Sequence, residues 1–413
     1  MDTKVIDLSA LRRQGSLFDD APARVPFGTV PAASAARQVA TTPQVDAMLA
    51  ADAAVAMSVS GGKDGAAMAL AVVKHLDRIG HSGPRLLIHA DLGRVEWTDS
   101  LPSCERLARL LGLELVVVRR QAGDMLARWQ GRWIANVARY EALSCVRLIL
   151  PWSTPALRYC TSELKTAVIT RELRKRFPTQ PIVNVVGIRR QESPGRRKMP
   201  VSGDMPALAR RGGFTGVAWN AVIEWPLEDV WAEIHDAGLL PHEAYTRYGS
   251  SRVSCAFCIM GSMADLQAST RCEDNQAVYR QMVDLEAEST FAYQGARWLA
   301  DVAPQLLSAD LVERVQHAKA MALVRCAAEA RLPEHLLFVK GWPTRMPTTG
   351  EAALIAAVRR DVSAAVGLSA ACPDADAGMA RYGELMAARR GAVDATADAP
   401  ADCEPDLVTD MGC

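Results

Sequence analysis

Apolar and polar residues alternate along the first half of the chain in a pattern that predicts short buried strands separated by helices. Ala53 to Met57 is a continuous apolar run, and an Ala- and Leu-rich segment of helical character follows it to about Leu76. Further strands are predicted at Arg85 to Ala90, Leu113 to Val118 and Ile182 to Val186, with a helix at Ser100 to Leu111. Strands that alternate with helices pair in parallel, so the sequence predicts an α/β fold with a doubly wound, mostly parallel sheet.

The pattern changes to a helical one after about residue 275. Apolar residues at helical spacing predict helices at Ala277 to Glu288, Ala296 to Leu307, Asp310 to Arg331 and Glu351 to Val366. We therefore expect four parts: a mobile lead-in at 1–45, an α/β domain at 46–275, a helical domain at 276–390 and a disordered tail at 391–413.

The segment from Ser58 to Gly65, Ser-Val-Ser-Gly-Gly-Lys-Asp-Gly, joins the first predicted strand to its helix. Adjacent glycines let a backbone turn with its N–H groups facing inward, and the following helix points its free N–H groups and positive dipole end at the same place. Lys63 adds a positive charge, and Ser58 and Ser60 add hydroxyl donors. The segment is thus predicted to bind a phosphate; the alternative is a glycine-rich turn that carries an accidental lysine. The predicted binding residues are Ser58, Ser60, Gly61, Gly62, Lys63, Asp64 and Gly65.

This loop resembles the pyrophosphatase loop of the PP-loop superfamily, although Gly65 stands where that superfamily usually has serine. Three further segments resemble the phosphoadenylyl-sulfate reductase family: His89 to Gly93, Arg158 to Lys165 and Gly187 to Ser193. The resemblance covers roughly residues 50 to 275. It implies an adenine nucleotide α-hydrolase-like fold, and it implies an enzyme that cleaves ATP between its α and β phosphates with Mg²⁺.

The resemblance also assigns roles to individual residues. Asp91 would contact the ribose or adenine, or hold a magnesium ion, with a turn or helix-cap aspartate as the alternative. Gly187 opens the segment that carries Arg189 and Arg190, and one of these arginines would contact the nucleotide phosphates, because a guanidinium pairs well with such anions. Together with Lys63, Arg189 and Arg190 are the predicted catalytic residues.

Cysteines provide a second chemical signal. Cys255 and Cys258 form a Cys-x2-Cys pair, and Cys272 follows fourteen positions later. The two thiolates of such a pair can coordinate one metal from a tight turn, and a zinc ion or an iron-sulfur cluster needs four ligands of this kind. The family resemblance places Cys160 as the fourth. We expect a 4Fe-4S cluster at these cysteines, with zinc or plain buried thiols as the alternatives.

Composition sets modest limits on partners and location. Lys plus Arg and Asp plus Glu each number 47, so the formal net charge is zero and argues for no nucleic-acid or membrane partner. No apolar run is long enough to span a bilayer, and no secretion signal is apparent, so a cytoplasmic protein without a membrane partner is expected. The oligomeric state stays open.

Three functions follow from these observations. The first is an ATP pyrophosphatase that adenylates its target in sulfur transfer or nucleic-acid sulfur modification, which implies a nucleic acid or sulfur-transfer proteins as partners. The second is a reductase of phosphoadenylyl sulfate (PAPS) or adenylyl sulfate (APS). The family's C-terminal Glu-Cys-Gly-x-His element is missing, so Cys403 would have to serve as its nucleophile. The third is a regulatory protein that senses a nucleotide without turnover.

Overall fold

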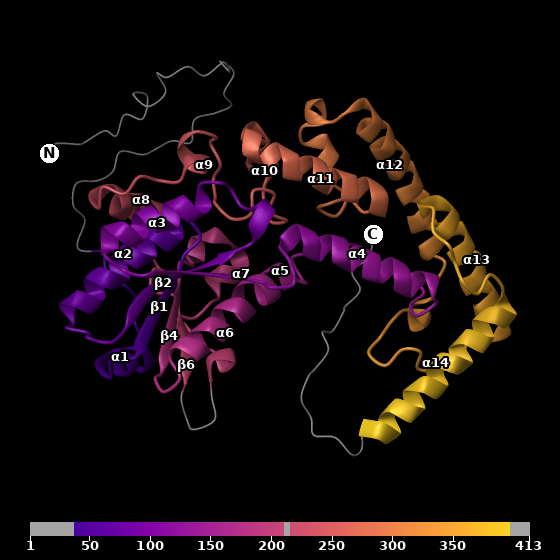
Figure 1. Cartoon of the computed structure of the whole chain (residues 1–413), viewed down its shortest axis with the longest axis horizontal. Coiled ribbons are helices and arrows are strands. Elements are labelled where there is room, and N and C mark those ends of the chain that lie inside the picture. The colour runs from indigo at the N-terminus through magenta and orange to yellow at the C-terminus, as the bar shows by residue number, and fades with distance from the viewer. Residues whose placement is uncertain (1–36, 210–214, 397–413) are drawn as a thin grey trace. The chain divides into compact units, whose positions relative to one another are not determined.

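The computed structural model describes residues 37–209 and 215–396, and it divides into two compact units (Figure 1). The first unit contains residues up to Asp91, Trp97–Arg119 and Lys165–Ser254. The second contains Leu92–Glu96, Arg120–Leu164 and the residues from Cys255 onward. Residues 1–36 of the predicted lead-in and 397–413 of the predicted tail lie outside the described residues, and a helix already begins at Pro43, within the predicted lead-in.

A six-stranded sheet in the order β3-β2-β1-β4-β6-β5 forms the centre of the first unit. Every neighbouring pair is parallel except β5 and β6, which confirms the predicted mostly parallel α/β fold. The strands are β1 Ala54–Ser58, β2 Arg85–Asp91, β3 Leu115–Arg119, β4 Ile182–Val186, β5 Ser202–Asp204 and β6 Gly216–Trp219. In the middle of the sheet, Met57 pairs with Leu87 on one side and Val185 on the other.

The first four residues of β1, Ala54 to Met57, are apolar because both faces of the strand are covered by helices. Val55 and Met57 join one apolar cluster with α2 and α3, whereas Ala54 and Ala56 join a second cluster with α6. The sheet is therefore doubly wound, as predicted. The α-helices of this unit are α1 Pro43–Ala50, α2 Lys63–Arg78, α3 Ser100–Leu111, α6 Ala167–Arg176, α7 Pro194–Arg197, α8 Leu227–Asp236 and α9 Glu243–Thr246.

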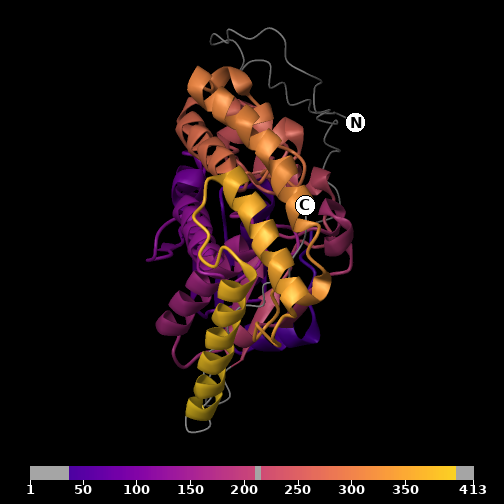
Figure 2. The same ribbon diagram turned by 90° about the vertical axis from the view of Figure 1, so that its right-hand side faces the viewer.

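The second unit is helical. Its α-helices are α4 Met125–Glu141, α5 Tyr159–Thr161, α10 Met263–Arg271, α11 Glu273–Ser289, α12 Ala309–Glu329, α13 Thr349–Val366 and α14 Ala375–Thr396. From α10 to α14 each helix contacts the next one along the chain, and the orange and yellow ribbons of Figure 2 show the later part of this series. None of the helices in the described part of the chain combines the length and apolar character needed to cross a membrane.

One predicted helix is wrong. Residues 296–307 form only the short 3-10 turns Leu299–Asp301 and Pro304–Leu306. Pro304 forces the preceding Ala303 out of the helical region, to φ −149° and ψ 69°. In addition, the backbone N–H groups of Leu299 and Ala300 donate to the carboxylate of Glu286 instead of to helical carbonyls. At the other end of the unit, α14 continues to Thr396, past the predicted start of the disordered tail.

Candidate functional site

The predicted phosphate loop lies at the point where the chain reverses its direction across the sheet. From β1 the chain builds β2 and β3 on one side, and it returns to β4 on the other side of β1. Ligands of open parallel sheets bind outside the carboxyl ends of the strands at such a switch point. The loop after β1 and the Gly187 segment after β4 are therefore brought together at the position where a ligand is expected.

Two glycines allow the loop to adopt its path. Gly61 has a φ of +75°, and a Cβ atom there would lie 2.9 Å from the carbonyl oxygen of Ser100. Gly187 approaches the loop closely, since a Cβ atom on it would lie 2.5 Å from the Asp64 carbonyl oxygen and 2.6 Å from the Gly65 nitrogen. Only glycine fits at these two positions without displacing the backbone.

Two cations share one carboxylate at the start of α2. The Nζ atom of Lys63 lies 3.1 Å from Asp64 Oδ2, and Arg189 Nε lies 2.5 Å from Asp64 Oδ1. Both cations are buried, with Lys63 only 7% and Arg189 only 4% exposed. Lys63 Nζ also donates to the carbonyl oxygen of Ser251 at 3.2 Å. The arrangement keeps two positive charges beside the N-terminus of a helix, where an anion is favoured.

The two predicted arginines have different surroundings. Arg189 completes its contacts with the side chain of Gln191 and with the carbonyl oxygen of Trp225. Arg190 Nε lies 2.7 Å from Glu224 Oε1, and its Nη1 donates to the carbonyl oxygens of Arg197 and Met199. Thus Arg189 contacts the loop through Asp64, whereas Arg190 contacts Glu224 and the C-terminal end of α7.

The remaining predicted residues lie at the same edge of the sheet. Asp91 ends β2, and its Oδ2 atom lies 2.8 Å from Arg119 Nη2 at the end of the neighbouring strand β3. Ser58 donates its hydroxyl to Asn184 Oδ1 at 2.9 Å, which ties β1 to β4. The structure therefore gives the Ser58 hydroxyl a partner within the sheet.

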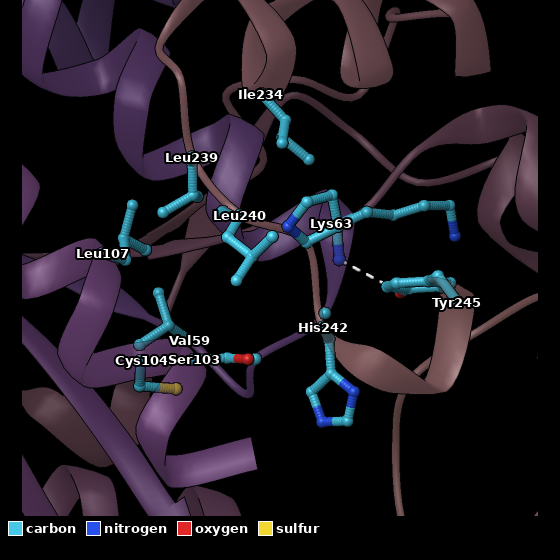
Figure 3. Close-up of a pocket in the computed structure, with 14 residues that line it drawn as sticks. Val59, Lys63, Ser103, Cys104, Leu107, Ile234, Leu239, Leu240, His242 and Tyr245 are labelled. Carbon is cyan, nitrogen blue, oxygen red and sulfur yellow. Dashed lines mark hydrogen bonds between the residues drawn. The ribbon is translucent and has the colours of Figure 1, made fainter. Parts of the chain in front are cut away.

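Tyr245 contacts the loop, and no motif in the sequence assigns it a role. Its hydroxyl oxygen accepts a hydrogen bond from the backbone N–H of Lys63 at 3.1 Å, drawn as a dashed line in Figure 3. Burial raises the pKa of Tyr245, so the hydroxyl remains protonated. The signal in the sequence is its place in α9, shortly after Leu240-Pro241-His242, but no local pattern pairs it with Lys63.

A cavity of about 20 Å³, with room for one water molecule, lies between the loop and α9. His242 lines it, and burial lowers the pKa of His242 to about 4. The ring is therefore neutral near pH 7, and its Nδ1 atom accepts the backbone N–H of Ala244 at 2.9 Å. This histidine packs against the loop, since a Cβ atom on Gly61 would lie 3.0 Å from its Cδ2 atom.

The four predicted metal ligands all belong to the second unit. Cys160, Cys255 and Cys258 are partly exposed, whereas Cys272 is only 1% exposed and caps α11. Burial raises the pKa of Tyr293, and the nearby thiols of Cys258, Cys255 and Cys160 raise it further.

The donor set suits a zinc ion or an iron-sulfur cluster, because thiolates are the ligands that both prefer. A buried polar atom also lacks a partner beside the same tyrosine. Trp129 packs edge-on against Tyr293, and its indole N–H has no hydrogen-bond partner among the described residues. Within those residues, however, no three His, Cys, Asp or Glu side chains are gathered closely enough to hold a metal ion.

Cys403, the nucleophile that the reductase alternative requires, lies outside the described residues.

A family model described as the phosphoadenosine phosphosulfate reductase domain matches residues 54–260, half of the chain. The chain belongs to this family. The match spans the phosphate loop, the Gly187 segment and the Cys255–Cys258 pair. It confirms the resemblance on which the sequence analysis relied, and members of this family are enzymes of the PP-loop superfamily.

Two solved structures are similar to this family member at low sequence identity. One is the phosphoadenylyl-sulfate reductase of Candida auris in a phosphate complex, with 14% identity, a TM-score of 0.30, and coverage of 49% of this chain and 80% of that one. Another is the U34-tRNA thiolase NcsA of Methanococcus maripaludis with its [4Fe-4S] cluster, with 11% identity, a TM-score of 0.28, and coverage of 62% and 81%. A search of curated proteins finds no match.

Proposed function

We propose that this chain binds ATP and cleaves it between the α and β phosphates, transferring AMP to a target and releasing pyrophosphate in a sulfur-transfer or nucleic-acid sulfur-modification reaction. The observation that carries the proposal is the convergence of Lys63, Asp64 and Arg189 on a phosphate loop at the sheet's switch point. The family assignment supports a sulfur-related PP-loop enzyme, and a related nucleotide such as PAPS or APS would occupy the same loop.

Charge explains how this loop would act. The N–H groups at the start of α2 and its dipole favour the negative charge that develops between the α and β phosphates. An incoming phosphate competes with Asp64 for Lys63 Nζ, whereas Arg189 holds Asp64 in place. Asp91 offers a carboxylate oxygen for Mg²⁺ at the end of β2, and the ion, when bound, neutralises phosphate charge.

The cysteines are proposed to hold a metal centre. Cys160, Cys255, Cys258 and Cys272 would supply its four thiolates. A 4Fe-4S cluster is the proposed group and zinc is the alternative. Either group needs deprotonated thiols and so would release protons on binding.

Pyrophosphate release from ATP and Mg²⁺ tests the proposal, with Lys63→Ala as the variant. Lys175→Ala is the control, because Lys175 is exposed on α6 and lies outside the loop. The proposal expects release from the wild type and the control, and a loss of at least tenfold in Lys63→Ala. Nucleotide binding without pyrophosphate release, with every acceptor supplied, would favour a nucleotide sensor instead. Thiol-dependent reduction of PAPS or APS that disappears in Cys403→Ala would favour the reductase.

A further inference from the structure

We infer that Tyr293 and Gln294 form a clamp: they are positioning residues whose side chains fix the backbone of the Cys255–Cys258 turn and so orient these two cysteines for metal binding. The inference rests on the metal centre proposed above. It concerns residues beyond the family match, which ends at residue 260, and it is carried by hydrogen bonds within the second unit.

The clamp acts on the backbone carbonyl groups of the turn. The Tyr293 hydroxyl donates to the carbonyl oxygen of Phe257 at 2.5 Å. Gln294 Nε2 donates to the carbonyl oxygens of Ile259 at 2.8 Å and Gly261 at 3.0 Å, and more weakly to that of Cys258 at 3.4 Å. Two consecutive side chains thus hold both the middle of the turn and the segment that leaves it.

Other hydrogen bonds hold the backbone of Ala256 and Cys258. Ala256 donates its N–H to the carbonyl oxygen of Val95 at 2.7 Å and accepts the hydroxyl of Ser269. The N–H of Gly261 returns to the carbonyl oxygen of Cys258 at 2.7 Å. Because the polar groups between the two cysteines are held in this way, the direction of both Cα–Cβ bonds is set before any ligand arrives.

The clamp is itself anchored. Tyr293 is 1% exposed, and its ring packs edge-on against Trp152 with ring centroids 5.0 Å apart. Its backbone N–H donates to Glu286 Oε1 at 2.8 Å, and Gln294 and Arg297 exchange two backbone hydrogen bonds. Because the donor side chain is already held rigidly, it can hold the turn without losing further conformational entropy when the metal binds.

Tyr293→Phe and Gln294→Leu test the inference, each with a matched control. Tyr279→Phe removes another buried tyrosine hydroxyl of the same unit, which donates to the carbonyl oxygen of Leu299. Gln276→Leu removes another glutamine that donates to a backbone carbonyl, that of Thr270. The measurements are Co²⁺ affinity under anaerobic conditions, read from thiolate absorption, and alkylation rates of Cys255 and Cys258 in the metal-free protein.

We expect each clamp variant to bind Co²⁺ about 10- to 100-fold more weakly than the wild type, which is the usual effect of losing a residue that orients metal ligands. Alkylation of Cys255 and Cys258 should become faster in the clamp variants and stay unchanged in the controls. If Tyr293→Phe fails to fold, Gln294→Leu carries the test alone, because its side chain is not part of the aromatic core.

The possible failures are distinguishable. If the wild type binds neither Co²⁺ nor iron with sulfide, the proposed metal centre is wrong and the inference is overturned with it, whereas the ATP chemistry at Lys63 is untouched. If the wild type binds Co²⁺ and the clamp variants match their controls in affinity and alkylation, the metal centre stands and the clamp alone is overturned.

Discussion

Arg189 reaches the phosphate loop through Asp64: its Nε atom lies 2.5 Å from Asp64 Oδ1, while Lys63 Nζ lies 3.1 Å from Oδ2 of the same carboxylate. Arg189 is 4% exposed, and removal of its partner would leave a buried guanidinium without its ion pair. The carboxylate therefore acts as a bridge that sets the positions of both cations, and this relationship separates Arg189 from its neighbour Arg190.

Replacement of Arg189 should weaken nucleotide binding more than replacement of Arg190. In Arg189→Ala, Asp64 has only Lys63 as a charged partner and holds it away from the phosphates, at a cost of about 1–3 kcal/mol. We expect a loss of affinity for a non-hydrolysable ATP analogue of at least tenfold in Arg189→Ala, measured by calorimetry. A larger loss in Arg190→Ala would show that the wrong arginine has been assigned to the loop.

Gly187→Ala should disturb the loop without any change of charge. The added Cβ would lie 2.5 Å from the Asp64 carbonyl oxygen, so the loop or β4 must shift, and we expect a loss of stability of about 1–3 kcal/mol together with weaker nucleotide binding. The control is Gly131→Ala in α4, where a Cβ atom meets nothing within 4 Å. An alanine there should stabilise the protein by about 0.5–1 kcal/mol. Urea unfolding and calorimetry measure both effects, and unchanged nucleotide affinity in Gly187→Ala would contradict the predicted close approach.

Gly65→Ser should be tolerated, although Gly65 replaces the serine usual in the superfamily. A Cβ atom at this position would lie 3.7 Å from the Ser58 carbonyl oxygen, which is an ordinary contact. Serine also has a higher helix propensity than glycine, so stability should rise by about 0.5 kcal/mol, and the new hydroxyl should keep or raise nucleotide affinity. Thermal unfolding and calorimetry measure the two effects. A fall in affinity would mean that the space beside Gly65 is needed for the ligand.

Glu286 should make stability depend on pH above about pH 4.5. Burial raises the pKa of this carboxyl to about 7, against the lowering effect of the N–H groups of Leu299, Ala300 and Tyr293. The folded state thus holds the proton more tightly than the unfolded state. Its contribution to stability is complete below the unfolded pKa and is lost as the pH rises through about 7, with a size on the order of 3 kcal/mol.

Glu286→Gln removes this titration, so its unfolding free energy should vary less between pH 5 and pH 7.5 than that of the wild type. The variant should also be less stable by about 1–3 kcal/mol, because an amide NH₂ would face a backbone N–H. Urea unfolding at several pH values measures both effects. Identical pH profiles for the two proteins would contradict the prediction.

Local patterns in the sequence determined the central strands, the turn between β1 and α2, and most of the C-terminal helices. The strand Ile182–Val186 and the helix Ser100–Leu111 have the predicted bounds, and α12 and α13 begin and end within two residues of them. These elements were predictable because their apolar periodicity and their glycines act over a few neighbouring residues. The predicted helix at 296–307 is wrong because such patterns register only near neighbours. The N–H groups of Leu299 and Ala300 bond instead to Glu286, which lies outside this segment.

Only the tertiary structure decided which side chains meet at the site. The sequence treats Arg189 and Arg190 alike, whereas the fold directs one to Asp64 and the other to Glu224. The approach of Tyr245 to the Lys63 N–H, and of Tyr293 to the cysteine turn, joins residues that are far apart along the chain. Such contacts depend on how the chain is folded in three dimensions, and no short stretch of sequence encodes them, because their energy comes from burial and hydrogen bonds that exist only after the elements have packed.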